Sequence, residues 1–188
     1  TGLVVAVSDD AGRLLWVEGS PGLRSRAESM NFVEGANWSE AHAGTNAPGT
    51  ALATDHAVQI FGHEHWNRIV QPWSCTAAPI HDPSTGRVLG VLDVTGGDVV
   101  ASPHSLALVQ AAVHAIETEL RLLTMAPPVP RSRRNGPRAA TRRLEVLGVD
   151  HGVLHLAVQL RTISTPPTEI VTLLALDGQR SCDLPEGV

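Results

Sequence analysis

Histidine and cysteine supply the most reactive side chains of this sequence. His63, His65 and His81 occur close together, and Cys75 lies among them. Imidazole and thiolate groups bind zinc or haem iron. His63 and His65 share a face only if their segment is a strand, and no carboxylate-rich or Cys-x-x-Cys set accompanies them. We therefore expect pocket-edge or surface histidines without a metal or other cofactor, and a haem bound through His65 is an alternative.

Cys75 is the second candidate for chemistry. A thiol becomes a nucleophile or a redox sensor when a neighbouring base or helix N-terminus activates it. The apolar, strand-like surroundings of Cys75 instead predict a small buried hydrophobe, with a redox sensor as the alternative. The other cysteine, Cys182, is far away in sequence, so no disulfide framework is expected. No nucleophile, base and acid occur at a defined spacing, and the sequence does not predict an enzyme.

Tryptophan is the third suggestive residue type. Aromatic residues make up only 3% of the chain, yet Trp38, Trp66 and Trp73 fall in the same stretch as the histidines. Large apolar rings can wall a cavity for a small apolar or aromatic molecule. Ordinary core packing explains them equally well.

Several elements must position these residues. Residues 3–7 and 13–17, joined by an Asp-Asp-Ala-Gly turn, predict an antiparallel hairpin. Residues 19–36 are polar and are expected to be irregular surface. A short helix over 39–42 would have Ser39 as its cap. Gly44 and Asn46 suit positive φ, and Pro48 suits the first turn of a following helix.

The next segments alternate between the two kinds of structure. We expect a strand over 56–60, a helical segment over 64–70, and strands over 75–80 and 87–94 joined by a Pro- and Gly-containing turn. Apolar residues at helical spacing predict a long amphipathic helix over Pro103–Leu123. This helix either packs on its own sheet or pairs with a second copy of the chain. The fold class is α+β, with helices packed on an antiparallel sheet.

Composition and net charge indicate the compartment and the kinds of partner expected for this chain. Apolar residues make up 43% of the chain and the net charge is −5, which suits a solubly folded protein in a reducing cytoplasm, with no membrane partner and no nucleic-acid binding by the whole chain. All basic residues are arginine, a bias typical of an actinobacterium-like source.

Residues 125–141 form a Pro- and Arg-rich linker. Residues 142–188 predict a β-hairpin and then a helix that begins near Thr165 and includes Ile170–Leu174.

Three motifs together carry a family resemblance. Residues 44–52 read Gly-Thr-Asn-Ala-Pro-Gly-Thr-Ala-Leu, residues 73–80 read Trp-Ser-Cys-Thr-Ala-Ala-Pro-Ile, and residues 90–96 read Gly-Val-Leu-Asp-Val-Thr-Gly. Their order resembles the GAF sensory domain of bacterial transcriptional regulators of the acetoin-activator type. The resemblance covers residues 1–124. It implies a central antiparallel sheet, a small-molecule effector pocket and a homodimer.

The resemblance also implies site residues and further segments. Pocket-lining candidates lie between the sheet and residues 36–73: Trp38, Asn46, Phe61, His65, Trp66, Trp73, Cys75 and Asp93. Such domains have a helix before the first strand, which we expect to be missing here. Residues 142–188 resemble the start of a winged-helix-like output domain too incomplete to bind DNA specifically. The alternatives to a ligand sensor are a structural dimerisation module and a haem or redox sensor.

Overall fold

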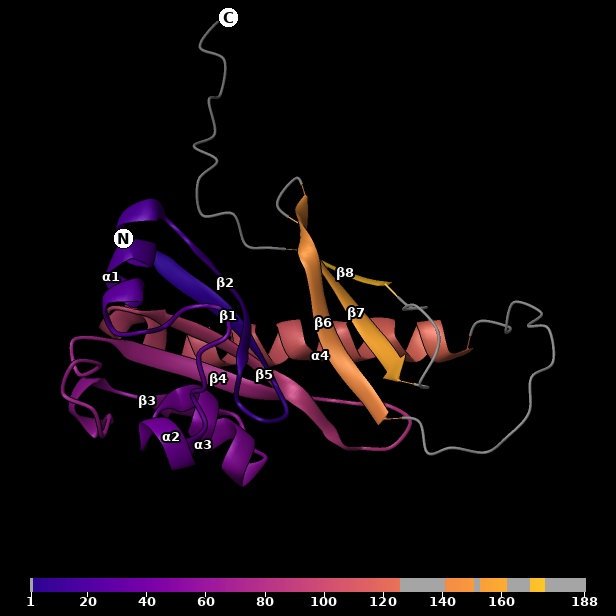
Figure 1. Ribbon diagram of the computed structural model, residues 1–188, viewed down its shortest axis with the longest axis horizontal. Helices are drawn as coiled ribbons and strands as arrows, with labels where there is room; N and C mark the ends of the chain where they lie inside the picture. The colour runs from indigo at the N-terminus through magenta and orange to yellow at the C-terminus, as the bar shows by residue number, and fades with distance from the viewer. Residues whose placement is uncertain (1, 126–140, 151–152, 162–169, 175–188) are drawn as a thin grey trace, which may run out of the picture.

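The main feature of the fold is a five-stranded antiparallel sheet. The computed structural model describes residues 2–125, 141–150, 153–161 and 170–174 (Figure 1). The strand order is β2-β1-β5-β4-β3. The strands are β1 (Leu3–Asp9), β2 (Leu14–Gly19), β3 (Val58–Ile60), β4 (Ser74–His81) and β5 (Val88–Gly96). The two predicted hairpins are therefore confirmed, and β5 is the central strand.

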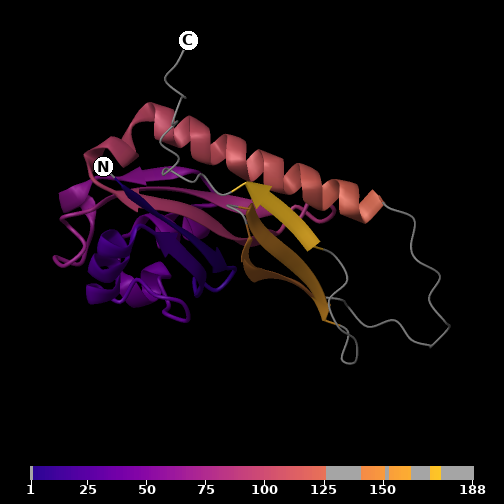
Figure 2. The same cartoon turned by 90° about the horizontal axis from the view of Figure 1, so that it is seen from above.

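Helices cover both faces of this sheet. The long helix α4 (Pro103–Met125) lies along one face, and α1 (Pro21–Ser29), α2 (Glu40–Ala43) and α3 (Ala47–Thr54) lie on the other (Figure 2). Two short 3₁₀ turns, η1 (Gly62–Glu64) and η2 (Asp98–Ala101), flank strands of the sheet. The α+β class is confirmed, and the main sheet has helices packed on each of its two faces.

The central strand β5 is buried on both faces. Leu92 and Val94 belong to the core cluster that contains the inner face of α4. Val91 belongs to the cluster that contains Ala47 and Ala51 of α3. Because side chains alternate along a strand, Asp93 and Thr95 lie on the same side of the sheet as Val91. We call this the α3 side, and the opposite one the α4 side.

The predicted irregular surface over residues 19–36 is wrong in part, because this segment contains α1. Pro21 occupies the first turn of α1, where its missing N–H costs nothing. Only Ala27 among the α1 residues is buried. A helix with so little buried surface has no apolar stripe, which is why periodicity did not reveal it.

Two local predictions in the motif region also need correction. The segment over 64–70 is not a helix: the turn η1 ends at Glu64, and bends and turns continue to Pro72. Gly44 has a φ of 70°, as predicted, but Asn46 has a φ of −155°. Asn46 is instead the N-cap residue of α3. Ser39 occupies the N-cap position of α2 without a capping hydrogen bond.

The C-terminal region contains a second, three-stranded antiparallel sheet, with β8 beside α4 (Figure 1). Its strands are β6 (Thr141–Asp150), β7 (Val153–Arg161) and β8 (Ile170–Leu174), in the order β6-β7-β8. The predicted hairpin is confirmed. The predicted helix is wrong over Ile170–Leu174, a segment rich in β-branched residues that pairs with β7. The proposed cap Thr165 and residues 126–140 of the linker lie outside the described residues.

A winged-helix-like domain is not shown, and the domain boundaries at 124 and 141 stay a prediction. Within the described ranges, no helix is long and apolar enough to cross a membrane.

Candidate functional site

A polar centre lies on the α3 side of the sheet, where the flanking residues are small and apolar. We define the polar centre as Cys75 of β4 and Asp93 and Thr95 of β5. In the ladder, Cys75 lies opposite Thr95, and Asp93 lies between Ala6 of β1 and Ala77 of β4. All three polar side chains are at most 4% exposed. The sequence-based list contained Cys75 and Asp93, and the structure brings them together.

Hydrogen bonds connect the three side chains in series. The Thr95 hydroxyl lies 2.6 Å from Asp93 Oδ2 and 3.1 Å from Cys75 Sγ. A hydroxyl has one hydrogen to donate, and the carboxyl oxygen at the shorter distance is the better acceptor. Thr95 therefore donates to Asp93 Oδ2, and its contact with Cys75 Sγ is the longer of the two.

The surroundings of Cys75 favour its protonated form. Burial raises the pKa of Cys75 well above its ordinary value, and the nearby Asp93 carboxylate raises it further, against a smaller opposing effect of the Thr95 hydrogen bond. Cys75 is therefore a neutral thiol. This environment is the opposite of the electropositive, accessible one that activates a cysteine.

Asp93 is an unusual group to find in this position. Burial raises the pKa of Asp93 from its ordinary 3.8 to about 7, and the hydrogen bond from Thr95 opposes this rise. Within the part of the chain that the structure describes, Asp93 Oδ1 has no hydrogen-bond partner. Buried polar atoms are normally paired, so this oxygen requires an explanation.

Ser8 is a residue that sequence analysis missed. Ser8 of β1 lies opposite Val91 of β5, so its side chain is on the α3 side and diagonal to Asp93. It is 1% exposed, and its hydroxyl also lacks a partner among the described residues. The signal was available, because Ser8 follows Val4 and Ala6 in the period-two pattern of an inward-facing strand.

His65 is buried beneath the loop that follows η1. It is 2% exposed, and its Nδ1 lies 2.9 Å from the Gly62 carbonyl oxygen. Burial lowers the pKa of His65, although Gly62 and Glu64 act in the opposite direction. The neutral ring donates from Nδ1 to Gly62, which leaves Nε2 as an acceptor without a partner in the described part of the chain.

The three histidines singled out in the sequence do not come together. His63 Nδ1 pairs with the Gln71 side chain at 3.2 Å, while His81 lies at the far end of β4. Among the described residues, no three His, Cys, Asp or Glu side chains form a group that could hold a metal ion.

Asn46, Trp38 and Trp73 are buried residues with structural roles. Asn46 Oδ1 accepts from the Gly49 N–H at 2.8 Å, and its Nδ2 donates to the Gly44 carbonyl at 2.7 Å, so its amide is occupied in shaping the start of α3. Trp38 and Trp73 are buried in the core cluster shared with β1 and α1. Their placement corresponds to the core-packing alternative for the tryptophans.

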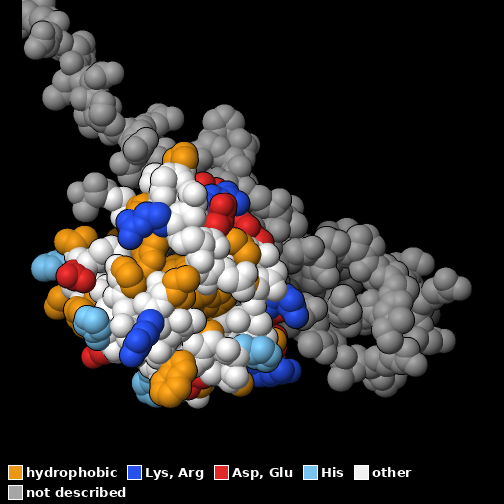
Figure 3. Space-filling model, turned by 60° about the vertical axis from the view of Figure 1, so that its left-hand side comes forward, with side chains coloured by type: hydrophobic (Ala, Val, Ile, Leu, Met, Phe, Trp, Pro, Cys, Tyr) orange, Lys and Arg blue, Asp and Glu red, His pale blue; other side chains and the backbone are white. Residues whose placement is uncertain are grey.

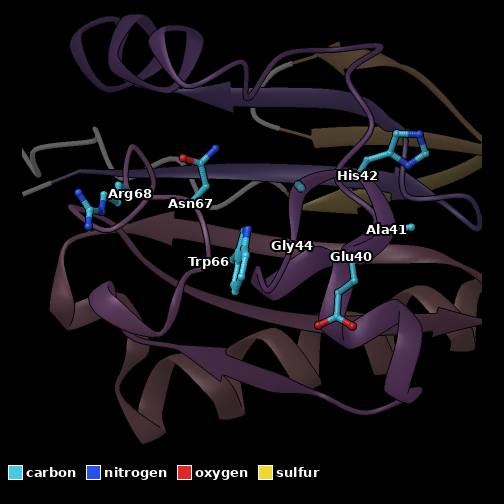
Figure 4. A pocket seen from close by; sticks show the side chains of 8 residues that line it. Glu40, Ala41, His42, Gly44, Trp66, Asn67 and Arg68 are labelled. Carbon is cyan, nitrogen blue, oxygen red and sulfur yellow. The ribbon is translucent and has the colours of Figure 1, made fainter.

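Phe61 and Trp66 lie at the surface instead. Their side chains are 47% and 77% exposed. Trp66 borders a shallow depression of about 700 Å³ formed by Glu40–Gly44 and Trp66–Arg68, and Figure 4 shows its ring between the Gly44 turn and Asn67. Phe61 borders a second depression of about 490 Å³. On the face seen in Figure 3, hydrophobic side chains occur in several places separated by polar surface.

His81 connects the two helical layers. Its Nε2 lies 2.7 Å from Asp55 at the C-terminal end of α3, and its Nδ1 lies 2.9 Å from Glu117 of α4. Burial lowers the pKa of His81, but the hydrogen bonds with Asp55 and Glu117 outweigh this effect and the net pKa is raised. A protonated His81 donates to both carboxylates and holds α3 and α4 across the sheet edge. From the sequence, His81 was expected to be a pocket-edge or surface histidine, and its two carboxylate partners were not predicted.

The fold places the protein in the class of GAF-like domains. The chain superimposes on the crystal structure of the E. coli DhaR(N)–DhaL complex with a TM-score of 0.63 and 20% sequence identity. The match covers 66% of this chain and 43% of that chain. Similarity at this level of identity shows the fold alone.

Residues 4–118 match the family described as MimR, N-terminal domain, and the chain belongs to this family. The matched range contains the main sheet from Val4 onward and most of α4. The resemblance to the sensory domains of transcriptional regulators is thereby confirmed for this part of the chain.

Similar proteins come from several bacteria. An uncharacterized 47.3 kDa protein in the thcA 5′ region of Rhodococcus erythropolis is 53% identical over 93% of this chain and 39% of its own length. The acetoin dehydrogenase operon transcriptional activator AcoR of Bacillus subtilis is 37% identical over 74% of this chain and 23% of its own length. The propane 2-monooxygenase operon transcriptional activator MimR of Mycolicibacterium smegmatis is 35% identical over 51% of this chain and 16% of its own length. The chain thus spans well under half the length of these relatives.

Proposed function

We propose that this chain is the effector-sensing part of a bacterial transcriptional regulator. Its relatives with assigned functions are named as activators or regulators of transcription rather than as enzymes. The polar centre is the proposed effector site, with the alternating residues of β1, β4 and β5 as its floor and α3 above it. The relatives are longer than this chain, so a DNA-binding output domain is proposed to lie in the whole protein.

The unpartnered Asp93 Oδ1 is the observation that carries this proposal. Leaving a buried polar atom without a hydrogen bond costs about 1–3 kcal/mol, and more for a charged group. A core required only for packing has no use for a carboxyl group at the centre of its sheet. An effector that pairs with Oδ1 gains the interaction that the protein alone does not make.

The sheet and the His81 bridge offer a route from this site to α4. Asp93 faces α3, while its neighbours Leu92 and Val94 pack against α4. His81 joins the end of α3 to α4. An effector that binds one arrangement of α3 more tightly than another shifts the population of α4 positions, and α4 leads towards the C-terminal sheet.

A thermal denaturation screen tests the proposed function. The protein is mixed with small alcohols, ketones, phenols, nucleotides and haem; haem is included because His65 Nε2 lacks a partner. A compound present at 100 times its Kd adds about 2.7 kcal/mol, which raises the Tm by several degrees. The shift is expected to shrink in Asp93→Asn. A screen in which no compound raises the Tm would contradict the effector site.

A dimerisation module is the second candidate function. Leu108 and Leu122 of α4 are 47% and 56% exposed, and their spacing of four helical turns places them on one side of the helix. Pairing of two α4 helices would cover both leucines. Sedimentation equilibrium of the wild-type chain and of Leu108→Glu tests this candidate; it predicts a dimer that the glutamate disrupts, and a monomeric wild type would contradict it.

A further inference from the structure

We infer that the depression around Trp66 is a surface on which two copies of this chain associate across a two-fold axis, with the Trp66 rings near the axis and Arg68 of each copy facing Glu40 of the other. This surface lies outside the polar centre, and the inference concerns assembly rather than effector binding. It follows from the exposure of Trp66, from the contacts that hold its ring and from the charges on either side of it.

The Trp66 ring is an apolar surface that the single chain leaves uncovered. Among the large apolar side chains of the described residues, Trp66 has the highest exposed fraction, 77%. The depression of about 700 Å³ beside it is also lined by the small apolar residues Ala41 and Ala43. Tryptophan contributes strongly to protein–protein binding when its ring becomes buried. The ring and the two alanines therefore offer a contact area to another protein surface.

The position of the Trp66 ring is fixed by the chain beside it. The Trp66 N–H donates to the Thr45 carbonyl at 3.0 Å. Gly44 lies directly against the ring, because a Cβ atom at this position would collide with Trp66. Ordering a flexible side chain is one of the costs of association. A ring that is already held in place loses little freedom when a partner covers it.

Charged side chains of opposite sign lie on either side of Trp66. In Figure 4, Arg68 lies on one side of the ring and Glu40 of α2 lies on the other. Both side chains are exposed, and neither forms an ion pair with another residue that the structure describes. Glu40 Oε1 accepts from the Thr50 hydroxyl at 2.7 Å, which leaves its other carboxyl oxygen for an incoming group. The order along the surface is therefore positive, aromatic and negative.

This order of charges identifies a second copy of the chain as the partner. A two-fold axis through the centre of a surface patch brings each end of the patch against the opposite end of the other copy. Arg68 then faces Glu40 twice. The two Trp66 rings meet near the axis, where offset aromatic rings attract each other. Complementary charges of this kind set the orientation of two associating proteins.

The shape of the depression favours a protein surface over a small molecule. Ligand pockets enclose most of the surface of their ligand, whereas this depression is shallow and open. Its lining comes only from residues 40–44 and 66–68, so the contact area is small. Small interfaces are typical of weak and transient association. We therefore expect a dimer that forms and dissociates reversibly.

Sedimentation equilibrium of the whole chain at about 0.01–1 mM, the range in which a weak interface dissociates, tests the inference. We expect the wild type to dimerise, and we expect its Kd to rise severalfold when salt is added to about 0.5 M, because exposed ion pairs are screened. Trp66→Ala should raise the Kd about tenfold or more, since each dimer loses two rings. A wild type that stays monomeric, or an unchanged Kd in Trp66→Ala, would overturn the inference.

Two charge-reversed variants test whether Arg68 faces Glu40. Arg68→Glu and Glu40→Arg should each raise the Kd about tenfold or more, because like charges then face each other. An equal mixture of the two variants should return to within about threefold of the wild-type Kd, since both facing pairs of the mixed dimer again have opposite charges. Arg87→Glu is the matched control: Arg87 is exposed between β4 and β5, outside the depression, and the Kd should not change. A mixture that remains monomeric would refute the proposed geometry.

Leu108→Glu separates this surface from pairing of the α4 helices. If the dimer forms through Trp66, Leu108→Glu should dimerise as the wild type does. Loss of the dimer in Leu108→Glu together with an unchanged Kd in Trp66→Ala would assign the dimer to α4 and remove the inference.

Tryptophan fluorescence gives a measurement on the wild-type chain alone. Trp38 and Trp73 are already buried, so covering the exposed Trp66 ring is expected to dominate the change in emission. The emission should shift to shorter wavelength as the concentration rises through the Kd. A dimer that forms without such a shift would contradict the Trp66 contact.

Discussion

On the α4 side of the main sheet, Ser74 and Thr76 direct their hydroxyl groups to defined partners, whereas on the α3 side Ser8 and Asp93 each have an oxygen with no partner among the residues that the structure describes. Ser74 Oγ donates to Asp98 at 3.1 Å, and Thr76 Oγ1 donates to the Val100 carbonyl at 2.7 Å. The sheet thus carries paired hydroxyl groups of β4 on one side and unpaired oxygens of β1 and β5 on the other. This difference is the basis for placing the proposed effector site on the α3 side.

The largest expected effect tests the α4 side. Ile116 is fully buried in the α4 core cluster, and Ile116→Ala should lower the free energy of unfolding by about 2–5 kcal/mol because it leaves a cavity. Urea denaturation measures this change. The control Leu122→Ala, at a site 56% exposed, should change it by less than about 0.5 kcal/mol. Similar losses in the two variants would show that α4 does not form the core described above.

The pH dependence of stability tests the α3 side. Because the pKa of Asp93 is raised from 3.8 to about 7, the folded state holds a proton that the unfolded state releases. Stability due to Asp93 is therefore present below pH 4 and is lost as the pH rises to about 7, by up to about 4 kcal/mol. Asp93→Asn should remove this dependence and stabilise the protein at pH 8. The measurement is urea denaturation at pH 4, 6 and 8.

His65 and His81 also titrate in this range, so the comparison is made between variant and wild type at each pH. The pKa of His65 is lowered mainly by burial, whereas that of His81 is raised by its two carboxylate partners despite burial. These contributions are common to both proteins and cancel in the difference. A difference that does not change with pH would contradict the buried, titrating carboxyl group.

A pair of serine substitutions compares the two sides directly. Ser74→Ala should destabilise the protein by about 1–3 kcal/mol, because the Asp98 carboxylate and the Gly62 N–H lose their partner. Ser8→Ala removes a hydroxyl without a partner and should change stability by less than about 0.5 kcal/mol or increase it. Thermal and urea denaturation of the two variants measure both changes in stability. Equal destabilisation would remove the distinction between an open and a closed side.

The smallest effect concerns the bridge between the two sides. His81→Gln keeps a hydrogen-bonding side chain but loses the positive charge, and should cost at most about 1 kcal/mol at pH 6, because the partners are partly exposed and screened. Since the pKa of His81 is raised, its contribution is full below pH 6.5 and falls as the pH rises through the raised value. The cost should therefore be smaller at pH 8. His114→Gln, on the exposed face of α4, is the control.

Much of the main sheet could be predicted from the sequence. The apolar runs of β1 and β5 result from burial of these strands in the sheet, and the helical period of α4 results from burial of one stripe of the helix, so both are visible in the residue pattern. The helix α1 was not visible because it buries only Ala27. The segment over β8 was mistaken for a helix because a short apolar run does not distinguish the two structures.

The candidate site was predictable only in its central residues. Cys75 and Asp93 stand in adjacent predicted strands at inward positions, so their proximity could be inferred. Ser8 comes from a strand far away in sequence, and its placement depends on the β1–β5 register. The bridge from His81 to Asp55 and Glu117 depends on where α3 and α4 end and cross, which single-sequence patterns do not contain.

The short edge strand β3 has a consequence for how molecules of this protein meet one another. β3 pairs with β4 only at Cys75–Ala77, so the remainder of β4 is an outer edge of the sheet. An exposed edge invites a strand from another molecule. Along this stretch Pro79 has no N–H to offer, and the His81 N–H already donates to Glu117 at 2.8 Å. A foreign strand would find neither donor available, so these two positions do not support pairing with a strand of another molecule.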